Sequence, residues 1–223
     1  MRCFCRWDVH SPKLSFRDQT ILQFGDSWDL IANFVLLNPG SALPLNTTNQ
    51  TDFLKSKSLP FFIEPIEDEV YLEFKTDPLM KTLIKLFAGE FTGGVIKIYN
   101  LFNLKNQDSE QALKQLIQYR QHGKMFTKDA EIRFCDAPVI IASGGNVNDS
   151  TMLKQELIRH IGIASNDRLY RLGKISDKQF SILKVIANHN NMIESYHPSF
   201  TFKYGNTTNL GDLLSLNNIQ RSC

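Results

Sequence analysis

Short apolar segments alternate with amphipathic ones along this chain, and the alternation restricts its fold more than any other feature. Residues 32–37 carry no charge and stop at Asn38-Pro39-Gly40, a pattern typical of a buried parallel strand that ends in a turn. Strands that alternate with helices form α/β domains. We therefore expect a three-layer sandwich, with a central, mostly parallel four-stranded sheet flanked by helices.

The elements of this fold are assigned from local patterns. Strands are expected over residues 32–37, 95–99, 139–142 and 192–196, with an edge strand over 70–74. Helices are expected over residues 78–87, 109–122, 150–161 and 177–187. Asp77-Pro78 shows the signals of a helix start, because Asp is a favourable N-cap residue and Pro suits the first turn. The polar stretch 41–57 is predicted to be a long loop.

Composition bounds the class of protein. A chain of 223 residues with 42% hydrophobic residues can bury one substantial core, so we expect one domain over residues 1–223. The net charge of +2 gives no global basic field, although a local basic patch remains compatible with DNA binding. The four cysteines lack zinc-site spacing and are expected to be reduced thiols. With neither a signal peptide nor a membrane-spanning run, a cytoplasmic location is expected.

Polar or glycine residues follow each strand of the expected sheet. They are Asn38-Pro39-Gly40, Asn100, Ser143-Gly144-Gly145 and His197-Pro198-Ser199. In a parallel sheet, the carboxyl ends of the strands share one edge, where open α/β proteins bind ligands. Each segment taken alone is most often a simple turn or a cap. Together, in this order, they predict one pocket.

These segments resemble motifs of the uracil-DNA glycosylase superfamily. Leu36-Leu37-Asn38-Pro39-Gly40-Ser41 is similar to the first motif of its mismatch-specific branch, and Ser195-Tyr196-His197-Pro198-Ser199 is similar to the closing His-Pro-Ser motif. Tyr99-Asn100-Leu101 falls where that superfamily presents a base-reading Asn. The chain also resembles an uncharacterised bacterial family that shares the Leu-Asn-Pro and Asn-Leu-Phe segments. The resemblance spans residues 30–205 and implies a uracil-DNA glycosylase-like fold.

The resemblance implies hydrolysis of an N-glycosidic bond without a metal or other cofactor. Asn38 would orient the attacking water, and His197 would hydrogen-bond the departing base as a neutral imidazole. The first motif lacks the Asp that would place negative charge opposite the sugar cation, which favours slower chemistry or a better leaving group. Asn100 would read the base edge. No Lys lies in a motif, so strand cleavage is not expected.

The resemblance also implies contacts around the reacting bond. Leu37 and an aromatic side chain, Tyr71 or Phe74, would contact the extruded base. Contacts to DNA phosphates are assigned to residues near the strand ends: Pro39, Gly40, Ser41, Ser143, Gly144, Pro198, Ser199 and Lys203.

The expected function is therefore excision of a flipped-out pyrimidine from DNA by a monomeric enzyme that needs no protein partner. The small residues after the first motif suggest a pocket open to an enlarged base, such as a hypermodified cytosine of phage DNA. The role would then be either repair or defence against phage. Two alternatives stay open: hydrolysis of a free nucleotide or nucleoside, and a non-catalytic nucleic-acid-binding module of the same fold.

Overall fold

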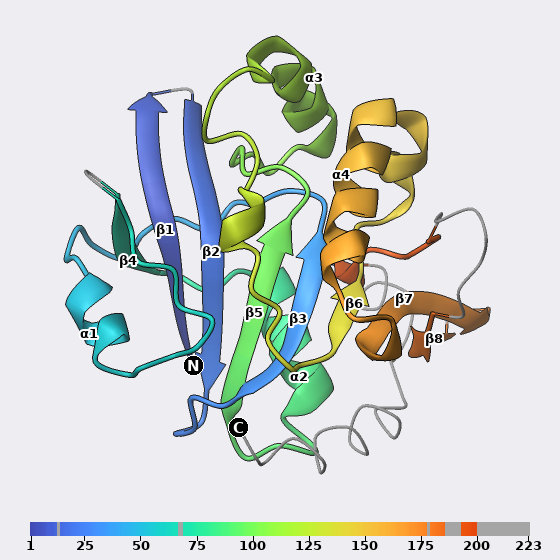
Figure 1. Cartoon of the computed structure of the whole chain (residues 1–223), viewed down its shortest axis with the longest axis horizontal. Helices are drawn as coiled ribbons and strands as arrows, with labels where there is room; N and C mark the ends of the chain where they lie inside the picture. Colours follow the sequence, from blue (N-terminus) through green and yellow to red (C-terminus); the bar gives the residue numbers. More distant parts are fainter. Residues whose placement is uncertain (13, 67–68, 178, 186–192, 200–223) are drawn as a thin grey trace.

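A mixed β-sheet forms the centre of the molecule. The computed structural model describes residues 1–12, 14–66, 69–177, 179–185 and 193–199 (Figure 1). Within them, the sheet has eight strands in the order β4-β1-β2-β5-β3-β6-β7-β8. Their bounds are β1 Arg2–Ser11, β2 Leu14–Phe24, β3 Leu30–Leu36, β4 Val70–Phe74, β5 Gly94–Asn100, β6 Val139–Ile141, β7 Leu169–Ser176 and β8 Gln179–Lys184.

Helices cover both faces of the sheet. The α-helices are α1 Thr51–Lys55, α2 Pro78–Phe87, α3 Ser109–Tyr119 and α4 Thr151–Ile163, and short 3-10 turns span Asp129–Glu131, Gly145–Asp149 and Asn166–Arg168. One face packs against α2 through Met80, Leu83 and Phe87. The opposite face, nearer the viewer in Figure 1, packs against α3 and α4. The sheet therefore separates two hydrophobic cores, and none of the described helices is long and apolar enough to cross a membrane.

The expected four-stranded, mostly parallel sheet is wrong. Strands β5, β3, β6 and β7 run parallel to one another, but β2, β1 and β4 extend the sheet on one side and β8 on the other, each antiparallel to its neighbour. Local sequence patterns did not indicate β1 and β2, because several charged residues interrupt the apolar pattern of each strand: Arg2, Arg6 and Asp8 in β1, and Arg17 and Asp18 in β2.

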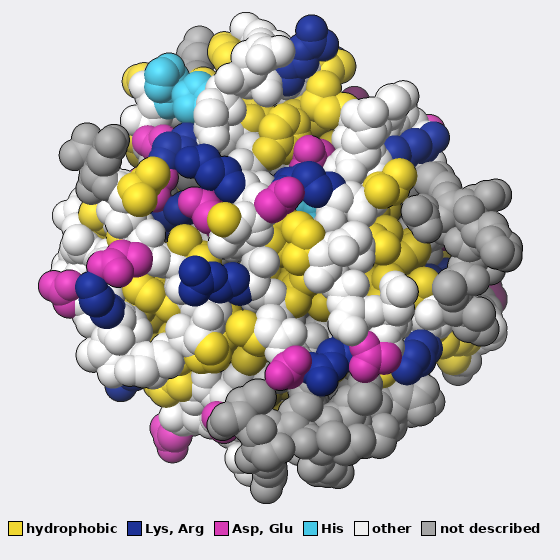
Figure 2. Space-filling view, in the orientation of Figure 1, with side chains coloured by type: hydrophobic (Ala, Val, Ile, Leu, Met, Phe, Trp, Pro, Cys, Tyr) yellow, Lys and Arg dark blue, Asp and Glu magenta, His cyan; other side chains and the backbone are white. Residues whose placement is uncertain are grey.

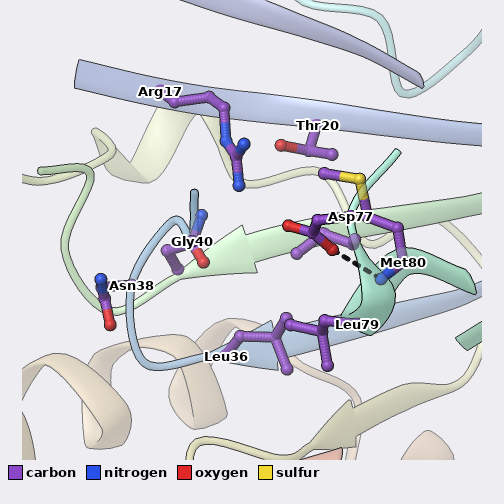
Figure 3. A pocket seen from close by; sticks show the side chains of 10 residues that line it. Arg17, Thr20, Leu36, Asn38, Gly40, Asp77, Leu79 and Met80 are labelled. Atoms are coloured by element: carbon purple, nitrogen blue, oxygen red, sulfur yellow. Dashed lines mark hydrogen bonds between the residues drawn. The ribbon is translucent and has the colours of Figure 1, made fainter. Parts of the chain in front are cut away.

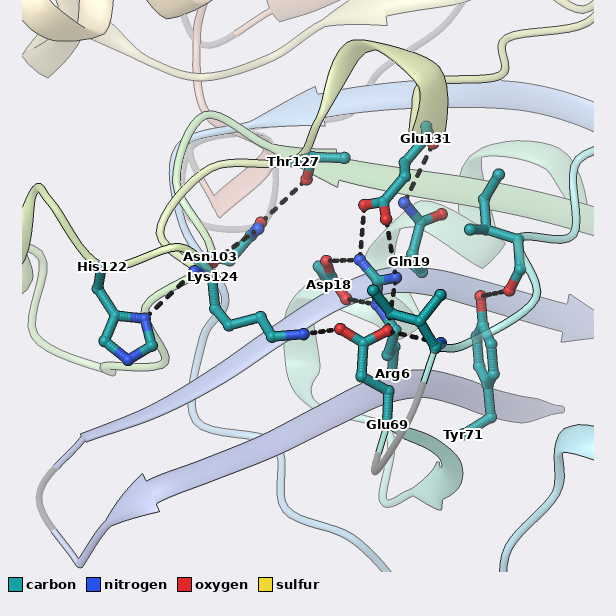
Figure 4. A network of polar contacts seen from close by, with 12 residues as sticks. Arg6, Asp18, Gln19, Glu69, Tyr71, Asn103, His122, Lys124, Thr127 and Glu131 are labelled. Atoms are coloured by element: carbon teal, nitrogen blue, oxygen red, sulfur yellow. Dashed lines mark hydrogen bonds and ion pairs between the residues drawn. The ribbon is translucent and has the colours of Figure 1, made fainter.

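Tertiary ion pairs explain how β1 and β2 bury those charges. Arg6 of β1 is 5% exposed, and its Nε donates to Asp18 of β2 at 2.8 Å. Its other nitrogens donate to Glu69 at 3.0 Å and to Glu131 at 2.7 Å, and Lys124 forms an ion pair with Glu69 (Figure 4). Partners far apart in the sequence therefore satisfy one guanidinium, a pairing that hydropathy cannot reveal.

The C-terminal elements also differ from expectation. Residues 179–184, predicted to be helical, form β8, in which Phe180 and Ile182 alternate toward the α2 face with the period of a strand. The predicted strand over 192–196 begins at Met192, outside the described residues, and residues 193–196 are not in a strand. The fourth parallel strand is β7 instead. Within the predicted loop 41–57, residues 51–55 form α1.

Candidate functional site

A small cleft opens where β3 and β5 end, on the face of the sheet covered by α2 (Figure 3). The cleft is narrow, because the centre of a water molecule can occupy only about 10 Å³ of it, which is room for about one water. Apolar side chains and polar groups from β2, the first motif and the start of α2 surround it. The lining residues are Arg17, Thr20, Leu36, Asn38, Gly40, Asp77, Leu79, Met80, Ile98 and Asn100.

The orientation of the Asn38 amide is fixed by backbone acceptors. Its Nδ2 donates to the carbonyl oxygens of Pro39 at 3.0 Å and Asn106 at 2.9 Å. The loop after β5 is itself held, because Asn106 N donates to Pro39 O at 3.2 Å. With both amide hydrogens used, Oδ1 is left as an acceptor that makes no hydrogen bond to the described residues. In Figure 3 the side chain of Asn38 lies across Gly40 from Arg17 and Asp77, so Oδ1 can accept a hydrogen bond from a water or ligand at this edge of the cleft.

Asn100, the last residue of β5, presents an unused amide to the same cleft. The residue is 3% exposed, and its side chain makes no hydrogen bond to a residue that the structure describes. Buried carboxamides are normally satisfied. An amide with both donor and acceptor available is suited to pairing with the edge of a heterocyclic base.

Asp77 brings a carboxylate to the cleft, and the sequence argument missed it. Oδ1 accepts a hydrogen bond from Met80 N at 2.9 Å, the N-cap interaction expected for α2. Oδ2 faces Gly40, because a Cβ added at that glycine would lie 3.3 Å from it. The cleft therefore has a carboxylate, which comes from the start of α2 and not from the segment after β3. Nothing in the local pattern distinguishes a purely capping Asp from one that also faces a cleft.

His197 does not line the cleft and does not follow a parallel strand, but it lies close enough to Asp77 for that charge to act on its pKa. Gly144 has φ +81°, and a Cβ there would lie 3.2 Å from the Cβ of His197. Burial lowers the pKa of His197 to about 4, and the charge of Asp77 opposes this shift. Ser199 N donates to Nδ1 at 3.3 Å, so the neutral ring carries its proton on Nε2. His197 is therefore a neutral hydrogen-bond donor near pH 7.

Arg17 is the second cleft residue that the sequence argument missed. It lies on β2 and is 4% exposed. One guanidinium nitrogen donates to Ala42 O at 3.2 Å, and the guanidinium carbon lies 5.6 Å from the ring centroid of Phe74. The guanidinium points toward Gly40 and Asp77 in Figure 3. A buried cation therefore stands in the cleft together with the Asp77 carboxylate.

The predicted base contacts are not all brought together. Tyr71 packs on the opposite face of the sheet, where its hydroxyl donates to Ile63 O at 3.1 Å. Leu37 also lies on that face, in the core beneath α3 and α4. Phe74 is on the α2 face but is 1% exposed and does not line the cleft. Of the predicted base contacts, only Asn100 lines it.

The predicted phosphate contacts lie in varied environments. Gly40 lines the cleft and Ser41 is exposed, whereas Pro39 and Pro198 are buried. Ser143 is 2% exposed and its hydroxyl shares a 3.4 Å hydrogen bond with Ser195, so it faces inward. Gly144 is half-buried against His197, and Ser199 Oγ lies 2.9 Å from His197 Nδ1. Lys203 lies outside the described residues.

Comparison with known proteins adds nothing to this geometry. No family model, curated protein or solved structure matches the chain. In the described part of the chain, no cluster of three or more His, Cys, Asp or Glu side chains is arranged to hold a metal ion. The chemistry of the cleft is therefore argued from its own side chains.

Proposed function

We propose that this protein hydrolyses the N-glycosidic bond of a pyrimidine nucleotide in DNA, with the base bound in the cleft against Asn100. One observation carries the proposal: Asn38, Asp77 and Asn100 come from three different segments and line one cleft, each with a side-chain oxygen that no described residue engages. Water activation, cation stabilisation and base recognition require these groups.

The reaction follows from the arrangement of acceptors and donors. Asn38 Oδ1 accepts a hydrogen bond from the attacking water, whose oxygen forms a bond to C1′ of the sugar. The C1′–N bond breaks and its electron pair stays on the base. Asp77 Oδ2 stabilises the positive charge on the sugar and receives the proton that the water loses. Nε2–H of His197 donates to the departing base, for which a neutral imidazole suffices.

Base release is the direct test. The purified full-length chain is incubated with DNA that contains uracil and with DNA that contains cytosine enlarged at C5, and free bases are quantified by mass spectrometry. We expect release from at least one of these substrates. Release from neither would refute the glycosylase proposal. If the chain binds the DNA but releases no base, the result would favour the non-catalytic nucleic-acid-binding module.

The variant Asp77→Asn tests the carboxylate charge of Asp77 separately from its role as the N-cap of α2. Asn is as good an N-cap residue as Asp, so α2 should remain intact while the cleft loses its carboxylate. We expect the rate of base release to fall roughly 100-fold or more, as for removal of one preorganised charge-stabilising group. Asp26→Asn, at an exposed turn after β2, is the matched control and should be active. Equal rates for both variants would exclude a role for Asp77.

Hydrolysis of a free nucleotide is a second candidate, favoured by the charge distribution. The net charge is only +2, and acidic and basic side chains are interspersed on the face shown in Figure 2. Binding of a DNA duplex through several phosphates weakens steeply as salt rises. The salt dependence of KM therefore separates the two: a steep dependence indicates DNA, and a flat one indicates a free nucleotide.

A further inference from the structure

Arg17 reaches the cleft because of an irregularity in its strand. Phe4 of β1 pairs with Ile21 of β2, whereas Arg6 pairs with Asp18, so β2 has one residue more than β1 over this step. This extra residue is a β-bulge, and Gln19 within it has φ +49°, an uncommon value for a residue other than glycine.

The bulge changes the direction of the side chains before it. In a regular strand, residues 17 and 20 would point to opposite faces, since side chains alternate. Here both Arg17 and Thr20 line the cleft. The strained backbone at Gln19 is therefore part of the bulge that turns the Arg17 guanidinium into the cleft.

The guanidinium is incompletely satisfied by the protein. Arg17 is 4% exposed, and among the described residues its Nε has no hydrogen-bond partner and no carboxylate forms an ion pair with it. A buried cation without a counter-ion is costly. Lys105 adds positive charge nearby: burial and the charge of Arg17 lower the pKa of its amine. The β2 wall of the cleft is therefore suited to an acceptor that carries negative charge.

We propose that Arg17 binds the base and stabilises the negative charge that the base acquires as it departs. This inference rests on the proposed N-glycosidic hydrolysis, in which the electron pair of the broken bond moves onto the ring and its carbonyl oxygens. Nη2 of Arg17, which makes no hydrogen bond to a described residue, donates to one of these oxygens, while Asn100 reads the neighbouring edge. Charge-assisted hydrogen bonds of this kind are stronger than neutral ones, so the bond strengthens as the charge grows.

Ligand binding tests the assignment without requiring turnover. The probes are barbiturate, a trioxopyrimidine that is anionic at neutral pH, and uracil, a neutral ring of similar shape. We expect the full-length protein to bind barbiturate at least tenfold more tightly than uracil, measured by calorimetry. Arg17→Gln should lose this preference and Arg17→Lys should keep part of it. Arg2→Gln, which removes a part-exposed ion pair with Glu73, is the control and should bind as the parent does.

Thermal unfolding and kinetics distinguish this role from a structural one. Arg17→Gln should melt at or above the temperature of the parent, because it removes an incompletely satisfied buried cation. On DNA with leaving bases of graded acidity, it should lose most rate with the poorest leaving group. The proposal would be overturned if the parent bound barbiturate and uracil equally. It would also be overturned if Arg17→Gln were unfolded while Arg17→Lys bound barbiturate like the parent and showed no change in rate. Arg17-dependent barbiturate binding without release of any base would support the site and refute the glycosylase function alone.

Discussion

Lys97 gives the sharpest test of how this core is built. It lies in the middle of β5 and is 0% exposed, and its Nζ makes no hydrogen bond to any residue that the structure describes. The nearest described cation–π contacts are to the rings of Tyr99 at 5.6 Å and Phe61 at 5.9 Å. Burial lowers the pKa of Lys97 from 10.5 to about 7. The folded protein therefore holds a lysine that is partly neutral at pH 7.

The magnitude follows from proton linkage. The fall in pKa from 10.5 to about 7 corresponds to a destabilisation of roughly 5 kcal/mol, at about 1.4 kcal/mol per pH unit. The unfolded chain binds the proton up to pH 10.5, whereas the folded chain releases it near pH 7. The destabilisation is thus complete below pH 7 and is relieved as pH rises toward 10.5. Over that window the free energy of unfolding increases with pH.

Lys97→Met removes the charge and keeps a chain of similar length between the aromatic rings. We expect the free energy of unfolding at pH 7 to rise by roughly 3 kcal/mol, since loss of the cation–π contacts offsets part of the gain. The melting temperature should rise by about 6–12 °C. Urea titrations of the parent and the variant at pH 7 and near pH 10 should show the difference shrinking with pH.

Lys114→Met is the control, since Lys114 is an exposed residue of α3. It should change stability by less than about 0.5 kcal/mol. A Lys97→Met variant less stable than the parent, or a difference that does not change with pH, would refute the reasoning. Either result would mean that the amine is hydrated or paired in solution.

Three further outcomes follow from the site and the ion-pair network. Because the pKa of His197 is lowered to about 4, kcat/KM for base release should show no inflection near pH 6.5 and should fall as pH drops through about 4; a pH profile checks this. Gly144→Ala should reduce the rate of base release, because residue 144 has φ +81° and an added Cβ would lie 3.2 Å from the Cβ of His197. Gly145→Ala is the control and should match the parent in the same assay, since a Cβ at residue 145 would have no atom within 4 Å. Arg6→Met should lower the free energy of unfolding by about 3–5 kcal/mol in urea titrations, since it leaves buried carboxylates without their partner.

Local sequence patterns predicted those strands and helices whose own residues carry the signal for them. The strands β3 and β6 follow from uncharged apolar runs, β5 follows from an apolar run that only Lys97 interrupts, and α2 follows from Asp77-Pro78. The strands β1, β2, β7 and β8 were not predicted. In β1 and β2, buried charges find partners only in the folded chain, and in β8 a short alternating segment follows a plausible cap.

The residues of the cleft also fall into two groups: those that local sequence patterns predicted and those that only the tertiary structure reveals. Asn38 and Asn100 could be predicted because each ends a buried strand, and parallel strand ends meet at one edge. Arg17 could not, because a bulge at Gln19 decides which face it occupies. Asp77 was recognised only as a cap, since the approach of Gly40 to its second oxygen is a tertiary contact.

The two missed residues together explain why one cleft can support charge separation. Arg17 and Asp77 both line it, yet no ion pair joins them, because Ala42 O and Met80 N are their respective partners. An ion pair would neutralise both groups and leave little field for a substrate. Held apart, the carboxylate can face a sugar that becomes cationic while the guanidinium faces a base that becomes anionic. The proposed hydrolysis of an N-glycosidic bond creates this pair of charges, so in that reaction the arrangement would favour the transition state over the neutral substrate.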